Sequence, residues 1–377
     1  MDNSVGIVET KYYKPNQNLP LESGKLLDEV TIAYETYGEL SPRKDNAVLI
    51  CHALSGDAHA AGFHHKDSPK PGWWDVMIGP GKAIDTTKFF VVCSNIIGSC
   101  MGSSGPSSIN PKDGRHYGLN FPVVTIGDMV QAQKQLVDYL GIDRLLSVIG
   151  GSIGGMQTLE WSIRFPDQVF SAVPLASAQR HSALSIAFNE VARQAIMADP
   201  NWQNGNYYES TKPGLGLAVA RMIGHITYLS DDALRNKFGR RLQDKKDFSF
   251  NFDADFQVES YLRYQGSKFV SRFDANSFLY ITKAADYFDL KTQHCADGQP
   301  LSAFAKAKAK FLVVSFTSDW LYPTYQSRAL VKAMKKNNLD VSFCEIEAQC
   351  GHDAFLLPNP RLSSLLAGFL DRMKKEY

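Results

Sequence analysis

Ser152 stands in sequence surroundings that could turn a serine hydroxyl into a nucleophile. The segment Gly150-Gly151-Ser152-Ile153-Gly154 matches the G-x-S-x-G pattern, in which the serine occupies a sharp turn between a strand and a helix. Glycine is needed on both sides because strand and helix approach too closely there for a Cβ atom. The motif predicts a strained Ser152 whose hydroxyl lies above a sheet edge, although a glycine-rich turn without any chemistry would show the same pattern.

An acid and a histidine follow Ser152 in the order that this type of nucleophile requires. Asp319 comes after the apolar run 311–316, and His352 follows the alternating segment 341–346, so each would lie near the end of a strand. Because the carboxyl ends of parallel strands meet at one edge of a sheet, the three side chains should lie together. Taken singly, Asp319 could be a helix N-cap and His352 a turn residue. We interpret the three as a catalytic triad, in which His352 accepts the serine proton and Asp319 orients the imidazole.

A nucleophilic serine also needs hydrogen-bond donors for the oxyanion of its tetrahedral intermediate. In this type of site one donor is the backbone N–H of the residue after the nucleophile, which is Ile153. The second comes from the loop after an early strand. The apolar run 47–51 predicts that strand, and we assign the second donor to the N–H of Leu54 in the loop 52–56.

Hydrophobic periodicity predicts the elements that position these residues. The run 145–149 predicts a strand before Ser152, and the segment 156–165, stopped by Pro166, predicts a helix after it. Short apolar strands alternate with amphipathic helices up to about residue 174, which is the pattern of an α/β fold with a mostly parallel sheet. One of these helices has an apolar face formed by Met129, Ala132, Leu136 and Leu140.

The alternation of strands and helices stops after about residue 180 and resumes near residue 311. The intervening segment is helix-patterned and rich in aromatic residues. We expect a core domain of residues 1–179 and 296–377, with an inserted helical lid of residues 180–295 lying over Ser152. The alternative is a separately folded helical module without a catalytic role.

Composition restricts the partners of the chain. The 377 residues include 40 Lys+Arg and 39 Asp+Glu, for a net charge of +1, so nothing indicates nucleic acid or an anionic membrane as a partner. The N-terminal residues lack the basic and apolar regions of a signal peptide, and no apolar run has the length of a membrane span. The six cysteines form no C-x-x-C pair and are expected to be reduced. These features predict a cytoplasmic protein.

Three histidines gather in one polar loop, at His59, His64 and His65. No second group of ligands at a useful spacing accompanies them, so the sequence predicts no metal site. The chain also lacks a phosphate-binding loop with its lysine. We therefore expect neither a bound metal ion nor a bound cofactor.

Several long strings resemble a single enzyme family from end to end. They are CHALSGD at 51–57, GPSSINP at 105–111, GGSIGGMQ at 150–157, RMIGHITY at 221–228, RFDAN at 272–276, YIT at 280–282 and CGHDAF at 350–355. These strings resemble the homoserine O-acetyltransferase family of acyltransferases with the α/β-hydrolase fold. Ile153 departs from the family pattern, which more often has methionine or leucine there. Its expected role depends on its backbone N–H and not on its side chain.

This resemblance implies an activity and an acceptor site. An acyl group would pass from a coenzyme A thioester to Ser152 and then to the hydroxyl of L-homoserine, a ping-pong reaction in methionine biosynthesis. Acetyl-CoA would be the co-substrate, with no bound cofactor, and the protein would be a homodimer. The positions that match the homoserine-binding residues of the family are Arg221, Tyr228 and Asp353.

The chemistry of an amino-acid acceptor fits these residue types. Its carboxylate needs a cation with fork geometry, and its ammonium needs an anion close to the catalytic base. Arg221 could supply the fork, with Tyr228 two helical turns later on the same face. Asp353, adjacent to His352, could supply the anion. Without the resemblance, a surface salt bridge for Arg221 and a helix cap for Asp353 would be the simpler interpretations.

The sequence leaves several alternatives open. Succinyl-CoA could replace acetyl-CoA as the donor, and serine could replace homoserine as the acceptor, since related proteins that use either donor share these motifs. A hydrolase of the esterase type would use the same triad with water as acceptor, and would have no use for the pair of Arg221 and Asp353. A catalytically inactive binding module is a further class, against which the complete triad argues.

Overall fold

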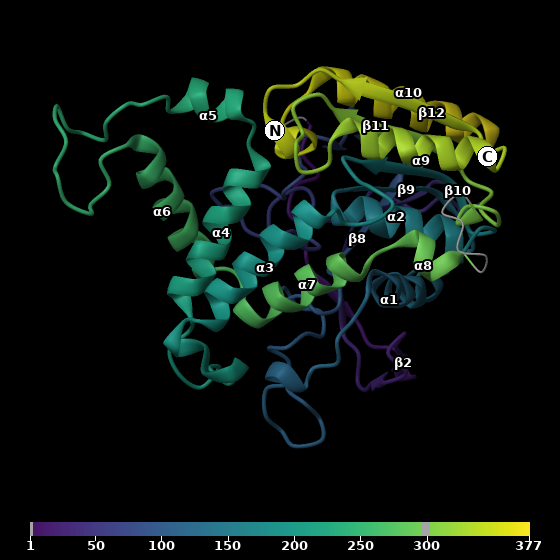
Figure 1. Cartoon of the computed structure of the whole chain (residues 1–377). Coiled ribbons are helices and arrows are strands. Elements are labelled where there is room, and N and C mark those ends of the chain that lie inside the picture. The colour runs from purple at the N-terminus through teal and green to yellow at the C-terminus, as the bar shows by residue number, and fades with distance from the viewer. Residues whose placement is uncertain (1–2, 296–301) are drawn as a thin grey trace.

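A central eight-stranded sheet organises the molecule (Figure 1). The computed structural model describes residues 3–295 and 302–377. The strands run in the order β1-β4-β8-β5-β9-β10-β11-β12, with antiparallel pairing of β1 with β4 and of β4 with β8, and parallel pairing across the rest. Their bounds are β1 Lys11–Tyr13, β4 Ile32–Tyr37, β5 Ala47–Cys51, β8 Phe90–Ser94, β9 Leu145–Gly151, β10 Val169–Leu175, β11 Lys310–Phe316 and β12 Val341–Ile346. The predicted α/β class with a mostly parallel sheet is confirmed.

Within the part of the chain that the structure describes, two small ribbons and several 3-10 helices lie around the sheet. The ribbons are β2 Leu19–Pro20 with β3 Leu26–Leu27, which is antiparallel, and β6 Ile78–Gly79 with β7 Ile84–Asp85, which is parallel. The 3-10 helices are η1 Gly118–Asn120, η2 Pro200–Gly205 and η4 Gly351–Phe355.

Helices cover both faces of the sheet. Alternate residues of a strand point to opposite faces, and Leu49 of β5 lies in one apolar core while its neighbour Ile50 lies in the other. The first core includes α1 Ile126–Tyr139, α2 Ile153–Arg164 and α9 Thr324–Lys336, and the second includes α10 Pro360–Glu376. The sheet is therefore buried on both sides, which explains the continuous apolar runs of its central strands.

Helix boundaries follow local signals. Thr125 caps α1 by accepting a hydrogen bond from the Asp128 N–H, and the Asp128 side chain accepts one from the Thr125 N–H in return. Helix α2 begins at Ile153, three residues before the predicted start at 156. The difference arises because the glycines after Ser152, which suggest a turn in sequence, form the first turn of the helix.

Among the described residues between β10 and β11, six α-helices lie within the segment predicted as a lid. They are α3 Ala183–Met197, α4 Gly214–Tyr228, α5 Asp231–Lys237, α6 Gln257–Val270, α7 Ala275–Tyr287 and α8 Leu290–His294. Figure 1 shows α4, α5 and α6 projecting to one side of the sheet. The predicted boundary at residue 296 falls outside the described residues, so the division into core and lid stays a prediction. Among the described residues, no helix has the length and apolar character needed to cross a membrane.

Candidate active site

The backbone at Ser152 has the strain that the motif predicts. Its φ of 60° and ψ of −124° lie in a region that residues other than glycine seldom adopt. Two hydrogen bonds hold this conformation: the Ser152 N–H donates to the Leu175 carbonyl at 3.0 Å, and the Ser177 hydroxyl donates to the Ser152 carbonyl at 2.9 Å. Both partners come from the end of β10 and its following loop. The neighbouring strand thus fixes the turn that presents the serine.

The glycines of the motif are required by close backbone contacts. A Cβ on Gly154 would lie 2.1 Å from the Cys51 carbonyl oxygen, and a Cβ on Gly150 would lie 2.3 Å from the Gly154 oxygen. These obstacles are backbone atoms, which cannot turn away as a flexible side chain could. Strand β9, helix α2 and the end of β5 therefore meet at this point because no side chains separate them.

Asp319 and His352 form a buried pair at the ends of β11 and β12. Nδ1 of His352 lies 2.7 Å from Oδ2 of Asp319, and each residue is 3% exposed. The other carboxylate oxygen, Oδ1, accepts hydrogen bonds from the N–H groups of Leu321 and Tyr322 at 3.0 and 2.8 Å. Asp319 thus caps the turn before α9 and also holds the imidazole. The N-cap of α9 itself is Pro323.

The Asp319 carboxylate sets the protonation of His352. Burial disfavours the charged imidazolium, but the negative charge of Asp319 and its hydrogen bond outweigh this and raise the pKa of His352 above its ordinary value. The anion therefore stabilises the cation that would form when the imidazole accepts a proton. In a catalytic triad, stabilisation of the imidazolium is a second role of the acid beside orienting the imidazole.

Tyr322 links Ser152 to the histidine. Its ring stacks on the His352 ring with centroids 5.0 Å apart, and its hydroxyl interacts with the Ser152 side chain. Tyr228 lies on another side of His352, at 6.0 Å between ring centroids, and lines the same cavity as Ser152. These shared neighbours bring the serine and histidine into one site. Direct proton transfer between them stays a prediction.

The two residues chosen as oxyanion donors line the cavity of Ser152. Leu54 and Ile153 both border it. The loop that carries Leu54 is held by the buried side chain of His52. The Ile96 N–H donates to Nε2 of His52 at 3.1 Å, so Nδ1 carries the proton and donates to the Ala53 carbonyl at 2.7 Å. Burial lowers the pKa of His52, which keeps the ring neutral and structural.

The three predicted acceptor-binding residues gather beside the pair of Asp319 and His352. The guanidinium of Arg221 lies 5.7 Å from the ring centroid of Tyr228, and its Nη1 donates to the Ser55 hydroxyl at 3.4 Å. Burial raises the pKa of the Asp353 carboxyl, while the charges on His352 and Arg221 oppose the rise. The cation of α4 and the anion of η4 are thus within electrostatic reach of one another and of the base.

Arg272 is a further cation at this place that the sequence did not single out as a site residue. Its Nη1 donates to the Ser55 carbonyl at 3.1 Å, and its guanidinium lies 5.3 Å from the ring centroid of Phe269. Arg221 lies 4.7 Å from the same ring. Burial and the nearby Arg221 charge lower the pKa of Arg272. The RFDAN string contained this residue, but its position beside Arg221 depends on the packing of α4 and α6.

A second histidine–aspartate pair lies behind Tyr322. Nε2 of His181 is 2.7 Å from the Tyr322 hydroxyl oxygen, and Nδ1 is 3.0 Å from Oδ1 of Asp286. Asp286 also accepts hydrogen bonds from Asn189 and Arg193, both at 2.7 Å. This network fixes the Tyr322 hydroxyl that contacts Ser152. No sequence pattern predicts this network, because its members come from four separate segments.

Lid helices supply much of the wall around Ser152. The residues from α3, α4 and α7 that line the cavity include Ser185, Phe188, Ile223, Tyr228 and Phe278. These helices therefore lie around Ser152, while their role as a lid stays a prediction. Substrate would reach Ser152 between the core and these helices.

The chain is similar to known proteins over nearly its whole length. Residues 46–358 match the family model of the alpha/beta hydrolase fold. The chain is 66% identical to a homoserine O-acetyltransferase from Solidesulfovibrio magneticus, over 98% of this chain and 94% of that protein. It is 54% identical to a homoserine O-succinyltransferase from Acidithiobacillus ferrooxidans, over 99% of this chain and 97% of that protein.

Solved structures show the same similarity in three dimensions. The crystal structure of homoserine O-acetyltransferase from Bacillus anthracis superposes with a TM-score of 0.90 at 28% identity, covering 97% of this chain and 98% of that one. The structure of an enzyme named esterase E22 superposes with a TM-score of 0.86 at 31% identity, covering 98% of this chain and 100% of that one.

Proposed function

Because the chain belongs to the homoserine O-acetyltransferase family within the α/β-hydrolase fold, we propose that it transfers an acetyl group from acetyl-CoA to the hydroxyl of L-homoserine. The observation that carries this proposal is the position of Ser152, strained at its turn and facing a cavity walled by lid helices. Arg221 and Asp353 lie beside the base of the same site. A cation and an anion so placed suit an amino-acid acceptor.

The first half-reaction would acylate the serine. His352 takes the Ser152 proton as the serine oxygen attacks the thioester carbonyl, and the N–H groups of Leu54 and Ile153 stabilise the oxyanion. When the intermediate collapses, the carbon–sulfur bond breaks and the CoA thiolate takes the proton from the imidazolium. The products are free CoA and an acetyl ester on Ser152.

The second half-reaction would transfer the acetyl group. Arg221 holds the carboxylate of homoserine and Asp353 its ammonium, which places the acceptor hydroxyl between His352 and the ester carbon. His352 removes the hydroxyl proton during attack and returns it to the Ser152 oxygen as the ester bond breaks. The cycle uses acetyl-CoA as a co-substrate and requires no bound cofactor.

The proposal also covers the acyl donor, the pathway, the cellular compartment and the oligomeric state. Acetyl-CoA is favoured as donor by the 66% identical relative, which is named an O-acetyltransferase, over the 54% identical one, which is named an O-succinyltransferase. O-acetylhomoserine formation would serve methionine biosynthesis. Six free cysteines suit the reducing cytoplasm. We also propose a homodimer, supported by apolar side chains exposed on the lid.

Steady-state assays with a panel of substrates test the function. Free thiol release would be followed with acetyl-CoA or succinyl-CoA, each with homoserine, with serine or with no amino acid. The proposal predicts the highest kcat/KM for acetyl-CoA with homoserine, and little thiol release without an acceptor. Equal release without an amino acid would indicate a hydrolase, and a preference for succinyl-CoA would correct the donor. No release with any combination would reject catalysis.

A further inference from the structure

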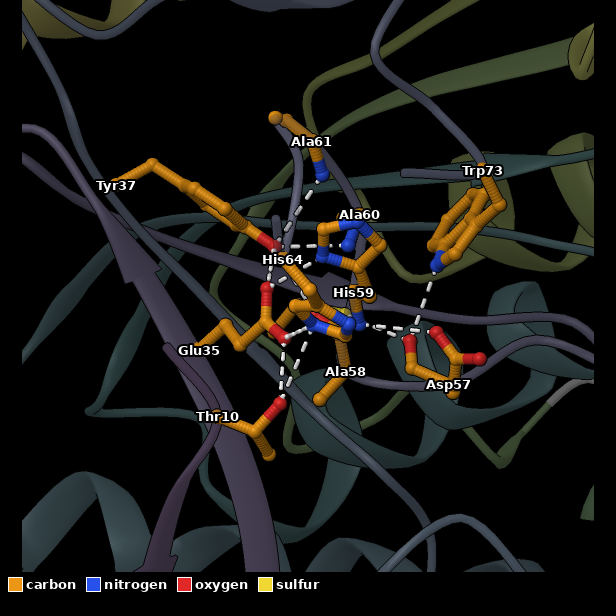
Figure 2. A network of polar contacts seen from close by, with 12 residues as sticks. Thr10, Glu35, Tyr37, Asp57, Ala58, His59, Ala60, Ala61, His64 and Trp73 are labelled. Atoms are coloured by element: carbon orange, nitrogen blue, oxygen red, sulfur yellow. Dashed lines mark hydrogen bonds and ion pairs between the residues drawn. The ribbon is translucent and has the colours of Figure 1, made fainter. Parts of the chain in front are cut away.

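A second cluster of chemically active side chains lies around Glu35 of β4. The Glu35 carboxylate is fully buried, and the side chains of His59 and His64 approach it from the loop after β5 (Figure 2). Nδ1 of His59 is 2.9 Å from Oε2 of Glu35, and Nε2 of His64 is 2.8 Å from Oε1. The sequence had shown the histidines but not this carboxylate, which lies 24 residues before His59 and on a different element.

These three side chains present a convergent set of metal ligands. One donor atom from each, two imidazole nitrogens and one carboxylate oxygen, lie within 4.8 Å of one another. Zinc binds histidine nitrogen and carboxylate oxygen at about 2.0–2.2 Å, which separates tetrahedral ligand atoms by about 3.4 Å. The present nitrogen-to-oxygen distances of 2.8 and 2.9 Å would need to open by about half an ångström. The exposed histidine of the cluster can make this adjustment.

An outer ring of hydrogen bonds orients the ligands. The Tyr37 hydroxyl donates to Oε2 of Glu35 at 2.9 Å and accepts the Ala60 N–H at 2.7 Å. The Thr10 hydroxyl donates to Oε1 at 2.8 Å. The Gly62 backbone also interacts with the His59 ring. Partners of this kind, which fix the carboxylate and the tautomer of a ligating histidine, are characteristic of metal centres.

The cluster is open to solvent on one side only. The His64 side chain is 41% exposed and that of His59 is 15% exposed, whereas the carboxylate has no exposure. An ion could therefore enter past His64 and keep a water molecule as its fourth ligand. Two neutral imidazoles and one carboxylate are a donor set suited to divalent ions such as Zn²⁺ and Co²⁺ rather than to Mg²⁺ or Ca²⁺.

We propose that Glu35, His59 and His64 form a binding site for a divalent transition-metal ion, with Zn²⁺ as the best-suited occupant. The ion takes the place of the protons that now join the two imidazoles to the carboxylate. It fastens strand β4 to the loop that continues from the Leu54 segment. The site is separate from the chemistry at Ser152, and the proposal does not depend on the proposed function.

Titration of the metal-free protein with Zn²⁺ tests this site. After treatment with EDTA and dialysis, isothermal titration calorimetry should show one ion bound per chain. His64→Ala removes an exposed ligand without opening the core, and should weaken Zn²⁺ binding by at least about tenfold, since loss of an outer-shell partner alone typically costs 10–100-fold. His65→Ala removes an adjacent exposed imidazole outside the cluster and should bind Zn²⁺ as the unmodified protein does.

Co²⁺ provides a second readout that reports direct ligation. Bound in a four-coordinate site with nitrogen ligands, Co²⁺ should give an intense visible absorption band in the unmodified protein and in His65→Ala, but not in His64→Ala. Glu35→Gln should also lose the band, and circular dichroism would establish that it remains folded. Absence of stoichiometric Zn²⁺ binding, or equal affinity in His64→Ala, would overturn the proposal and leave a purely hydrogen-bonded cluster.

Discussion

Asp319 shows how one side chain can serve two purposes in this site. Its Oδ2 holds His352 at 2.7 Å, while its Oδ1 accepts two backbone N–H groups of the turn that begins the α9 region. The backbone turn holds the carboxylate in place, and the carboxylate orients the imidazole. An oriented anion next to a general base stabilises the protonated form that arises during proton transfer.

The pH dependence of acylation follows from this pair. His352 must be neutral to act as a base, and Asp319 raises the pKa of His352, so activity should rise with pH through a value above the ordinary one of about 6.5. In Asp319→Asn the stabilising charge is lost, so this acid limb should move to lower pH while kcat falls by roughly 10⁴-fold. The measurement is kcat/KM for acetyl-CoA against pH in both proteins. An unchanged acid limb in the variant would show that Asp319 does not set the titration.

Arg221→Lys should separate the two half-reactions. A lysine keeps the charge but cannot hold a carboxylate through two parallel hydrogen bonds. A displacement of about 1 Å in the acceptor can cost roughly a hundredfold in rate, so kcat/KM for homoserine should fall by about that factor. Acylation by acetyl-CoA, followed before the steady state, should stay nearly normal because homoserine takes no part in it.

The matched control for this variant is Arg328→Lys. Arg328 lies on α9 and pairs with Glu345 at the surface, so this substitution should leave both half-reactions unchanged. Equal losses of acylation and of homoserine use in Arg221→Lys would assign Arg221 to the coenzyme or to the structure, and would refute the acceptor site.

Single residues differ in how far sequence could predict them. The places of Ser152, Asp319 and His352 at strand ends were predictable because each follows an apolar strand, while their joint catalytic role stays a prediction. Tyr322 was not predictable, since its role depends on stacking against His352 and on a contact with Ser152. Glu35 could not be predicted for a related reason, because a single buried glutamate on a strand forms no recognisable pattern. Its partners His59 and His64 come close to it only when the chain folds.

At the scale of elements, the junction of β9 with α2 is the most demanding part of the fold. Gly154→Ala would place a methyl group 2.1 Å from the Cys51 carbonyl oxygen, so strand and helix would have to separate. We expect a loss of about 1–3 kcal/mol in the free energy of unfolding, measured as a lower melting temperature, together with a loss of activity.

Gly368→Ala is the control for this substitution. Gly368 lies in α10 with no atom within 4 Å of the Cβ that alanine would add. Replacing an exposed helical glycine by alanine should stabilise the protein by about 0.5–1 kcal/mol. If both variants lowered the melting temperature alike, the close packing at Gly154 would not be the cause.

Elements of the sheet were predicted better than those of the lid. The central strands are buried on both faces, so their apolar runs stand out, and 47–51, 311–316 and 341–346 agree with β5, β11 and β12 to within a residue. Lid helices have polar, apolar and aromatic residues mixed around them because they pack on each other and on the core. Their presence could be predicted, but the division into separate helices could not.

In the whole molecule, the lid helices meet the core around the cavity of Ser152. Helices α3, α4 and α7 line the cavity of Ser152, and α4 also carries Arg221 towards the base. The proposed acceptor site thus combines residues from two parts of the chain, the sheet loops and the inserted helices. Opening of the lid would therefore disrupt acceptor binding before it affected the triad.

The lid also carries apolar side chains that suggest an interface with a second copy of the chain. The exposed ones on α4, α6 and the segment between α5 and α6 are Leu215, Val219, Ile226, Phe248, Phe250, Phe252 and Tyr264. Exposed apolar groups of this number on one part of a molecule are typical of interaction surfaces. Light scattering after size exclusion should give twice the 41.9 kDa of one chain.

A double variant tests the position of this interface. Phe250→Ser combined with Phe252→Ser should shift the dimer towards monomer, because both aromatic rings are almost fully exposed in the single chain. Leu26→Ser changes an exposed apolar residue of β3, away from the lid, and should remain dimeric. A dimer unaffected by the double variant would place the interface elsewhere, and a monomeric parent protein would reject the dimer.

The proposed reaction requires the acyl group to pass through Ser152, and trapping the acyl-enzyme tests this step. Acetyl-CoA supplied without an acceptor should leave an acetyl group on the peptide that contains Ser152, detected by mass spectrometry, and homoserine should remove it. Ser152→Ala should carry no such group and should lose activity by about a thousandfold or more, because the nucleophile and its base act as a unit. An unmodified Ser152 peptide, or near-normal turnover by folded Ser152→Ala, would contradict a covalent mechanism through Ser152.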